Sequence, residues 1–154
     1  MAGGSDTWTA SQSAATETVC RGVCRMLNQM GYGTLTEFRL TVPRRVDVIG
    51  LNDGGEFVIV EIKSSIEDYR ADRKWQDYLP YCDMFYFAVP AGFPNHVLPN
   101  DTGLIVADGF GAAVRRPSPV YAVNAARRRR QLHRFAMAAS TRLQRLCDPG
   151  IEGR

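Results

Sequence analysis

Two β-rich runs separated by a four-residue turn signal constrain the fold more than any other feature of the chain. The runs cover residues 45–51 and 56–63, and Asn52-Asp53-Gly54-Gly55 lies between them, a pattern typical of a β-hairpin. A three-residue loop with a glycine in the left-handed conformation would place Asp47 directly across from Glu61. A two-residue turn would shift the register by one residue and send Asp47 to the opposite face of the sheet.

The other elements give the order expected of a single α/β domain. Apolar spacing and stop signals predict helices over 11–30, over 66–79 and from Asn124 onward, and strands over 34–42, 84–89, 103–107 and 112–115. With 154 residues, 45% of them hydrophobic, the chain can build one core. We expect that domain over 11–148, with flexible segments at 1–10 and 149–154; the last four residues resemble a cleavage site used in protein expression.

The hairpin places charged residues in what is otherwise the most apolar strand. Residues two apart in a strand share a face, so Glu61 and Lys63 are neighbours and Asp47 joins them if the three-residue loop forms. Two carboxylates across a strand pair repel each other unless a proton or a cation lies between them. Mg²⁺ or Mn²⁺ would suit these oxygen ligands, and Lys63 could orient an attacking water or offset charge on a phosphate. A salt bridge without catalytic use is the alternative.

Asp47, the hairpin and Glu61-Ile62-Lys63, within an α, β, β, β, α, β order, resemble the PD-(D/E)XK nuclease superfamily. The stretches RRVDVIGL, VEIKSSIEDYRADRKWQDY, YCDMFYFAVP and LPNDTGLIVADGFGA are also similar to the MmcB-like DNA repair proteins of bacteria. The resemblance implies a restriction-endonuclease-like core, in which helices flank a central mixed β-sheet, and a role in DNA repair. It also implies that Asp47, Glu61 and the backbone carbonyl of Ile62 bind Mg²⁺, and that Lys63 is the catalytic lysine.

Superfamily members often add a glutamate from the first helix. The only one here is Glu17, which lies away from the centre of the apolar helix face, so Glu37 in the preceding strand is the second candidate; an exposed edge-strand residue is the alternative for Glu37. The resemblance does not by itself establish cleavage. A non-catalytic module of the same fold that binds DNA structures or recruits repair proteins is therefore the second hypothesis, and a homodimer is a further expectation.

Basic residues gather in two places that predict contacts with DNA. The first set surrounds the motif strand, and the second opens the last helix: Arg45, Arg70, Arg73 and Lys74, then Arg127 and Arg128. Nine arginines and no acidic residue lie between Gly109 and Cys147, which suggests a surface that faces a polyanion. A solvated helix start is the alternative for the run from Arg127 to Arg130. The basic residues after the motif strand could instead pair at helical spacing with Asp68, Asp72 and Asp77, and Trp75 and Tyr78 are read as core residues in preference to stacking platforms for bases.

Several other classes of protein are not indicated. The four cysteines and two histidines lack the spacing of zinc ligands, and no glycine-rich phosphate loop is present. No signal peptide and no apolar run that could span a membrane is visible. We expect a cytoplasmic, nucleoid-associated protein with DNA as its partner.

Overall fold

The computed structural model describes residues 5–72 and 74–150, and only the backbone of residues 5–12. The predictions for residues 1–4 and 151–154 and for Arg73 concern residues outside the described ranges. The elements, in chain order, are α1 (Ser5–Gln29), β1 (Gly33–Arg39), β2 (Arg45–Leu51), β3 (Phe57–Ile62), α2 (Ile66–Ala71), the 3₁₀ helix η1 (Trp75–Tyr81), β4 (Met84–Pro90), the 3₁₀ helix η2 (Asn95–Val97), β5 (Gly103–Ala107), β6 (Ala112–Arg116) and α3 (Ala125–Cys147).

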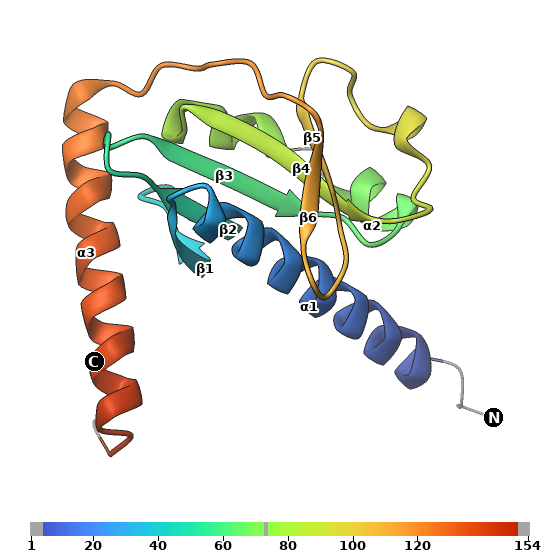
Figure 1. Ribbon diagram of the computed structural model, residues 1–154, viewed down its shortest axis with the longest axis horizontal. Helices are drawn as coiled ribbons and strands as arrows, with labels where there is room; N and C mark the ends of the chain where they lie inside the picture. Colours follow the sequence, from blue (N-terminus) through green and yellow to red (C-terminus); the bar gives the residue numbers. More distant parts are fainter. Residues whose placement is uncertain (1–4, 73, 151–154) are drawn as a thin grey trace.

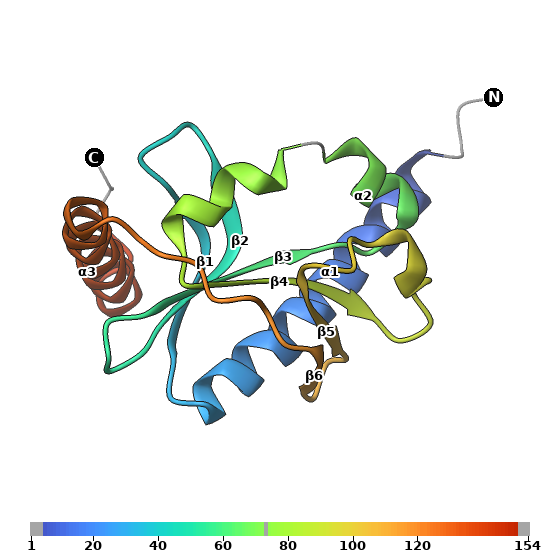
Figure 2. The ribbon, with the colours of Figure 1, turned by 90° about the horizontal axis from the view of Figure 1, so that it is seen from above.

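The six strands form one open mixed sheet in the order β1-β2-β3-β4-β5-β6. The β1–β2, β2–β3 and β5–β6 pairs are antiparallel, whereas β3, β4 and β5 run parallel. A parallel pair needs a crossover, which α2 and η1 supply between β3 and β4. Figure 1 shows α1 running along the sheet, and Figure 2 shows that α1 covers one face while α2 and the segment after it cover the other. The α/β fold with a mixed sheet between helices is confirmed, and it is consistent with a restriction-endonuclease-like core.

Burial on both faces of β3 organises two cores. Phe57 and Ile59 belong to a cluster with Phe85 and Phe87, whereas the alternate residues Val58, Val60 and Ile62 pack with Val19, Val23 and Leu27 of α1. All six residues of β3 are buried, which matches the continuous apolar run expected of a strand covered on both sides. Trp75 stacks on Phe85 and Tyr78 is buried, so their assignment to the core is confirmed.

α1 approaches the β5–β6 hairpin closely at Gly22. A β-carbon added at this position would lie 2.0 Å from the carbonyl oxygen of Asp108 and 2.5 Å from that of Gly111. Only glycine lets the helix backbone lie this near the turn. The helix also begins at Ser5, earlier than the sequence pattern indicated, inside the segment for which no element was expected.

The predicted second helix over 66–79 is wrong in one respect, because the chain breaks after Ala71. Asp72 ends α2 in an extended conformation, and a separate 3₁₀ helix begins at Trp75. The Asp72 carboxylate accepts hydrogen bonds from the Lys74 backbone N–H and from the Lys63 ammonium. A local acceptor of this kind competes with helical hydrogen bonding, so a tertiary ion pair overrides the helical spacing.

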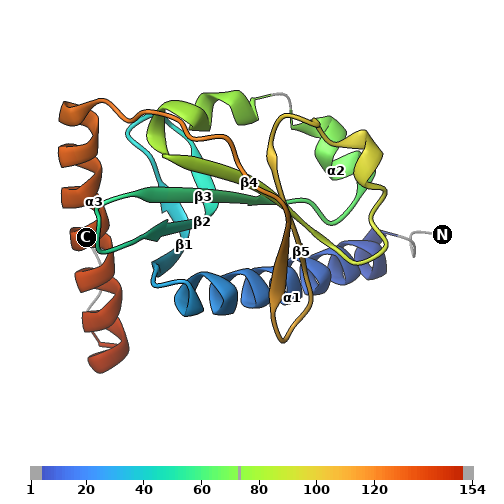
Figure 3. The ribbon, with the colours of Figure 1, turned by 45° about the horizontal axis from the view of Figure 1, so that its top comes forward.

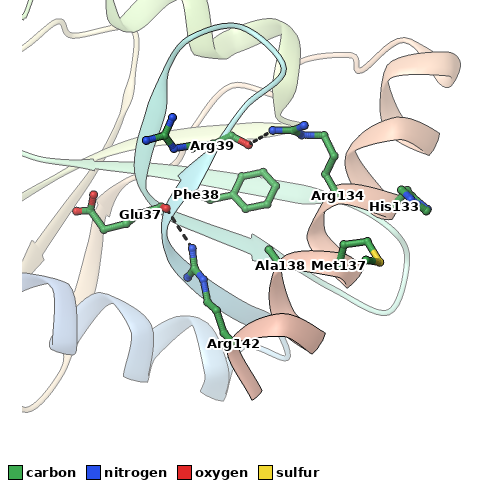
Figure 4. Close-up of a pocket in the computed structure, with 8 residues that line it drawn as sticks. All are labelled: Glu37, Phe38, Arg39, His133, Arg134, Met137, Ala138 and Arg142. Carbon is green, nitrogen blue, oxygen red and sulfur yellow. Dashed lines mark hydrogen bonds between the residues drawn. The ribbon is translucent and has the colours of Figure 1, made fainter. Parts of the chain in front are cut away.

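α3 stands beside the edge strand β1 (Figure 3) and caps its backbone with arginines. Arg142 donates to the carbonyls of Thr36 and Glu37 at 2.6 and 3.1 Å, and Arg134 donates to those of Arg39 and Leu40 at 3.0 and 3.2 Å; Figure 4 shows two of these contacts. Unpaired edge carbonyls otherwise invite pairing with another chain. These arginines therefore close the edge of the sheet.

The apolar face expected on α3 packs against the sheet over only part of its length. Leu132, Phe135 and Ala138 contact the core, whereas Leu143 and Leu146 are 62% and 80% exposed. The second half of the helix extends beyond the sheet (Figure 1). None of the helices in the described ranges combines the length and apolarity needed to cross a membrane.

A buried carboxylate joins three parts of the fold. Asp83 accepts hydrogen bonds from the Phe57 backbone N–H at 2.7 Å and from Arg128 of α3 at 2.6 and 2.9 Å, while the Tyr121 N–H donates to its carbonyl. Arg128 also donates to the carbonyl of Gly55 in the hairpin loop at 2.8 Å. The start of β3, the hairpin loop and α3 are therefore held by one network.

We expect Asp83→Asn to lower the free energy of unfolding by about 2–3 kcal/mol, because it leaves the Arg128 guanidinium without its charged acceptor. Urea unfolding followed by circular dichroism measures this loss. Asp101→Asn, at an exposed position, is the matched control and should change the free energy by no more than about 0.5 kcal/mol. Equal effects of the two substitutions would contradict the role of the network.

Candidate functional site

The candidate site forms where the backbone ladder between β2 and β3 stops. The register is the one predicted for a three-residue loop: Gly55 adopts a φ of 78°, Asn52 and Glu56 close the turn, and the pairing runs from Leu51–Phe57 to Val48–Val60. Both strands continue past the last pair, to Arg45 and Ile62. The next residues across from each other are Asp47 and Glu61.

Side-chain carboxylates replace the missing backbone bonds at this point. The Asp47 N–H donates to Oε1 of Glu61 at 3.1 Å, and the Ile62 N–H donates to Oδ2 of Asp47 at 2.8 Å. The second oxygen of each carboxylate accepts no hydrogen bond from the described part of the chain. These contacts orient the two acids toward each other's strand and leave one oxygen of each available as a ligand.

Burial makes this arrangement costly for two negative charges. Glu61 is 5% exposed and Asp47 is partly buried. Burial first and the neighbouring Asp47 second raise the pKa of Glu61 to about 8, and burial raises the pKa of Asp47 as well. Acids whose pKa values are raised in this way favour a proton or a cation between them.

Lys63 directly follows β3, and its ammonium pairs with Asp72 at the end of α2. Its Nζ is 2.9 Å from Oδ2 of Asp72, and the lysine is 5% exposed. Burial alone would lower the pKa of Lys63, but the hydrogen bond to Asp72 and the nearby carboxylates raise it above its ordinary value. The sequence pattern predicts Asp72 within a helix among basic neighbours. Helical periodicity does not indicate its contact with Lys63, which forms where that helix is interrupted.

Glu37 lies across from Asp47 in β1 but turns its carboxylate toward another residue. The pairs Thr36–Val48 and Phe38–Val46 flank it, and its φ of 52° falls in the left-handed region, which is strained for a residue with a side chain. Its carboxylate, 56% exposed, forms an ion pair with Arg45 at 2.6 Å. Arg142 holds the strained backbone through the Glu37 carbonyl.

The hollow beside Asp47 is lined by α1. Glu17, Cys20 and Cys24 lie around it together with Glu37 and Ile62. The two cysteines are partly buried and pack against the α1 side of the core, as expected of core thiols. Glu17 is exposed. Both glutamates considered for the site thus border the same hollow as Asp47.

The donor chemistry of the site fits a divalent cation of the Mg²⁺ type. Such ions bind through one or two carboxylates and keep several waters, and Asp47 and Glu61 offer one free oxygen each. Within residues 5–72 and 74–150, no group of three or more histidine, cysteine or acidic side chains is placed to hold a metal ion. The site therefore supplies two carboxylates and no more extended cage.

The basic residues proposed for DNA contact are in different situations. Arg45, Arg70 and Lys74 are exposed. The guanidinium of Arg127 lies 4.7 Å from the centre of the Tyr81 ring, whereas Arg128 is held by Asp83. Four of the nine arginines between Gly109 and Cys147 use their guanidinium groups to bind Asp83 or backbone carbonyls: Arg116, Arg128, Arg134 and Arg142.

The raised pKa of Glu61 predicts an unusual pH dependence of stability in metal-free buffer. The folded protein binds this proton more tightly than the unfolded chain, so the free energy of unfolding should fall as the pH rises from about 4.5 to about 8. Glu61→Gln should remove most of this fall, while Glu67→Gln at an exposed position should keep it. Urea unfolding across this range in EDTA tests the prediction, and a fall of the same size in Glu61→Gln would refute it.

Comparison with known proteins places the chain among its relatives. A search of curated proteins found no significant match. A solved structure of a protein of unknown function from Silicibacter pomeroyi matches with a TM-score of 0.87 and 40% sequence identity, over 90% of this chain and 95% of that one. The model of the family described as DNA repair protein MmcB-like matches residues 5–150. The chain therefore belongs to the MmcB-like DNA repair protein family.

Proposed function

We propose that the protein is a metal-dependent nuclease that hydrolyses phosphodiester bonds of DNA during repair. The observation that carries the proposal is the pair of buried carboxylates, Asp47 and Glu61, each bonded to the other's strand and each with a free oxygen. Membership of a DNA repair family supports DNA as the partner. The likeness of the Asp47, Glu61 and Lys63 pattern to PD-(D/E)XK nucleases supports hydrolysis.

Each residue has a role that its surroundings suggest. Asp47 and Glu61 would hold Mg²⁺ or Mn²⁺ between β2 and β3, and the peptide of Ile62 lies against Asp47 through its N–H. When bound, the cation would polarise the phosphate and lower the pKa of a coordinated water. Lys63 would leave Asp72, orient the attacking water and offset the charge that develops on the phosphate. Glu37 would join this set only after separation from Arg45.

One observation favours a second function, a DNA-binding or recruiting module of the same fold without cleavage. The Lys63 ammonium is 2.9 Å from Asp72, in an ion pair whose lysine is buried. A lysine in such an ion pair can stabilise the fold without taking part in catalysis. The two functions differ in whether Lys63 is needed for chemistry or only for the fold.

Cleavage of single-stranded, duplex, flapped and junction DNA with Mg²⁺ or Mn²⁺ tests the nuclease. We expect at least one of these to be cut, and we expect Asp47→Asn, Glu61→Gln and Lys63→Ala each to slow cutting by about 100-fold or more, as loss of one electrostatic contributor does in other enzymes. Asp101→Asn is the control and should cut like the wild type.

Binding of the same DNAs separates the two functions. Binding by wild type and Lys63→Ala with equal affinity, together with no cleavage of any substrate in either metal, would reject the nuclease and leave the binding module. Binding that persists in EDTA is compatible with both.

Metal binding can be measured independently of activity. Mg²⁺ or Mn²⁺ that binds only the folded state should raise the free energy of unfolding, by about 2.7 kcal/mol at a concentration 100 times the dissociation constant. Asp47→Asn should lose this gain, because it removes a charged ligand from the pair. Differential scanning fluorimetry with and without metal provides the readout, and an equal gain in Asp47→Asn would place the ion elsewhere.

A further inference from the structure

We infer that a pocket formed by the β1–β2 loop and α3 binds a phosphate of the DNA strand next to the candidate site. The pocket has a volume of about 610 Å³, and four arginines line it together with the loop residues Leu40, Thr41, Val42 and Pro43: Arg39, Arg44, Arg45 and Arg134. We call it the arginine pocket. This inference rests on the proposed function, which makes DNA the partner, and adds where the strand is held.

Two of these arginines oppose each other across the strand pair. Arg39 of β1 is paired in register with Arg45 of β2, so their side chains leave the sheet from Cα atoms about 5 Å apart. Like charges directly across a strand pair are destabilising. An oxyanion between the two guanidinium groups would turn this repulsion into attraction, as a cation would for Asp47 and Glu61.

The acidic partners present near the pocket are exposed and easily exchanged. Arg45 pairs with Glu37, with side chains 59% and 56% exposed, and Arg44 pairs at 3.1 Å with Asp77, which is 55% exposed. Exposed ion pairs contribute about 0–1 kcal/mol. A phosphate can therefore displace these acids at little energetic cost. Its bidentate hydrogen bonds with guanidinium groups are stronger than these exposed ion pairs.

Arg134 lines the pocket from α3, and one of its nitrogen donors has no acceptor in the described part of the chain. Its terminal nitrogen Nη2 donates to the carbonyls of Arg39 and Leu40, and Figure 4 shows it reaching β1 from α3. Its Nε is buried and makes no hydrogen bond with the described residues. The Arg134 guanidinium therefore adds a positive charge at the wall of the arginine pocket without an acidic partner among the described residues, and this charge favours an anion there.

The position of the pocket relative to the carboxylates suits one continuous strand. Arg45 precedes Asp47 by two residues in β2, a separation of about 6.6 Å along the strand. The loop is preorganised, because Leu40 donates to the Arg44 carbonyl at 2.9 Å and Arg44 donates to that of Val42 at 2.6 Å. A DNA strand with one phosphate at Asp47 and Glu61 would thus place a neighbouring phosphate at the arginine pocket.

The test compares the salt dependence of DNA binding in two double variants with equal loss of charge. Arg39→Gln/Arg45→Gln removes two arginines from the pocket, whereas Arg115→Gln/Arg145→Gln removes two exposed arginines from β6 and the end of α3. Fluorescence anisotropy of a labelled DNA in EDTA, between about 50 and 200 mM salt, gives the slope of the logarithm of the binding constant against that of the salt concentration.

We expect the pocket variant to reduce the magnitude of this slope by about 1–2 and to weaken binding about fivefold or more, alike for unrelated sequences, because each phosphate contact contributes about 0.7–0.9 to the slope. The control should keep both values near those of the wild type. Arg39→Lys/Arg45→Lys should retain most of the slope, since it keeps the charge.

The possible failures are distinct. Equal slopes for the pocket variant and the control, in a protein that binds and cuts DNA, would overturn the arginine pocket and leave the proposed function intact. A wild-type protein with no measurable affinity for any DNA would overturn both. Thermal unfolding of each variant confirms that it is folded, as expected for substitutions of exposed side chains.

Discussion

The left-handed glycine at the tip of the β2–β3 hairpin is the constraint on which the rest of the site depends. Gly55, with a φ of 78°, sets a three-residue loop and thereby the register that brings Asp47 across from Glu61. A shift of one residue would move one acid to the other face of the sheet. The carbonyl of the same glycine accepts from Arg128, which also binds Asp83. The loop is thus held both by its own conformation and by α3.

The strand β3 is covered on both faces and carries charge only at its C-terminal end. β3 is buried along its whole length between α1 and the aromatic layer of Phe85, Phe87 and Trp75. Its charged residues lie at its C-terminal end, beyond the last backbone pair with β2. Low exposure there raises the pKa of Glu61 and of Asp47, which is the electrostatic condition that a bound cation relieves. The apolar core and the chemistry of the site are therefore parts of the same arrangement.

The arginines of this chain illustrate how little composition says about a surface. The segment after Gly109 contains nine arginines and no acid, and its charge alone predicts a polyanion partner. Arg134 and Arg142 instead satisfy the carbonyls of the edge strand β1, and Arg128 satisfies Asp83. The partners of these groups are backbone oxygens and a single distant aspartate, which no local pattern reveals. The arginine pocket is instead lined mainly by arginines from the end of β1, the β1–β2 loop and the start of β2, whose acidic partners are exposed.

Local patterns in the sequence determined most of the fold. The turn signal at residues 52–55 determined the hairpin, the apolar run of β4 determined a buried strand, and Asn124 capped α3 as its position indicated. Each of these depends on a few consecutive residues, whose propensities are expressed wherever the chain folds. The carboxylate pair depended on the loop length, for which the sequence left two registers open, and the structure has the three-residue loop.

Only the tertiary structure decided which contacts the charged side chains make. Asp72 interrupts the helix predicted over 66–79 and pairs with Lys63, Glu37 forms an ion pair with Arg45, and α3 arginines bind the carbonyls of the edge strand. These contacts join residues from separate segments of the chain, and they can form only once the sheet has formed. Long polar side chains have many rotamers of similar energy, so their final positions depend on burial and on the nearest unsatisfied group, which the sequence does not display.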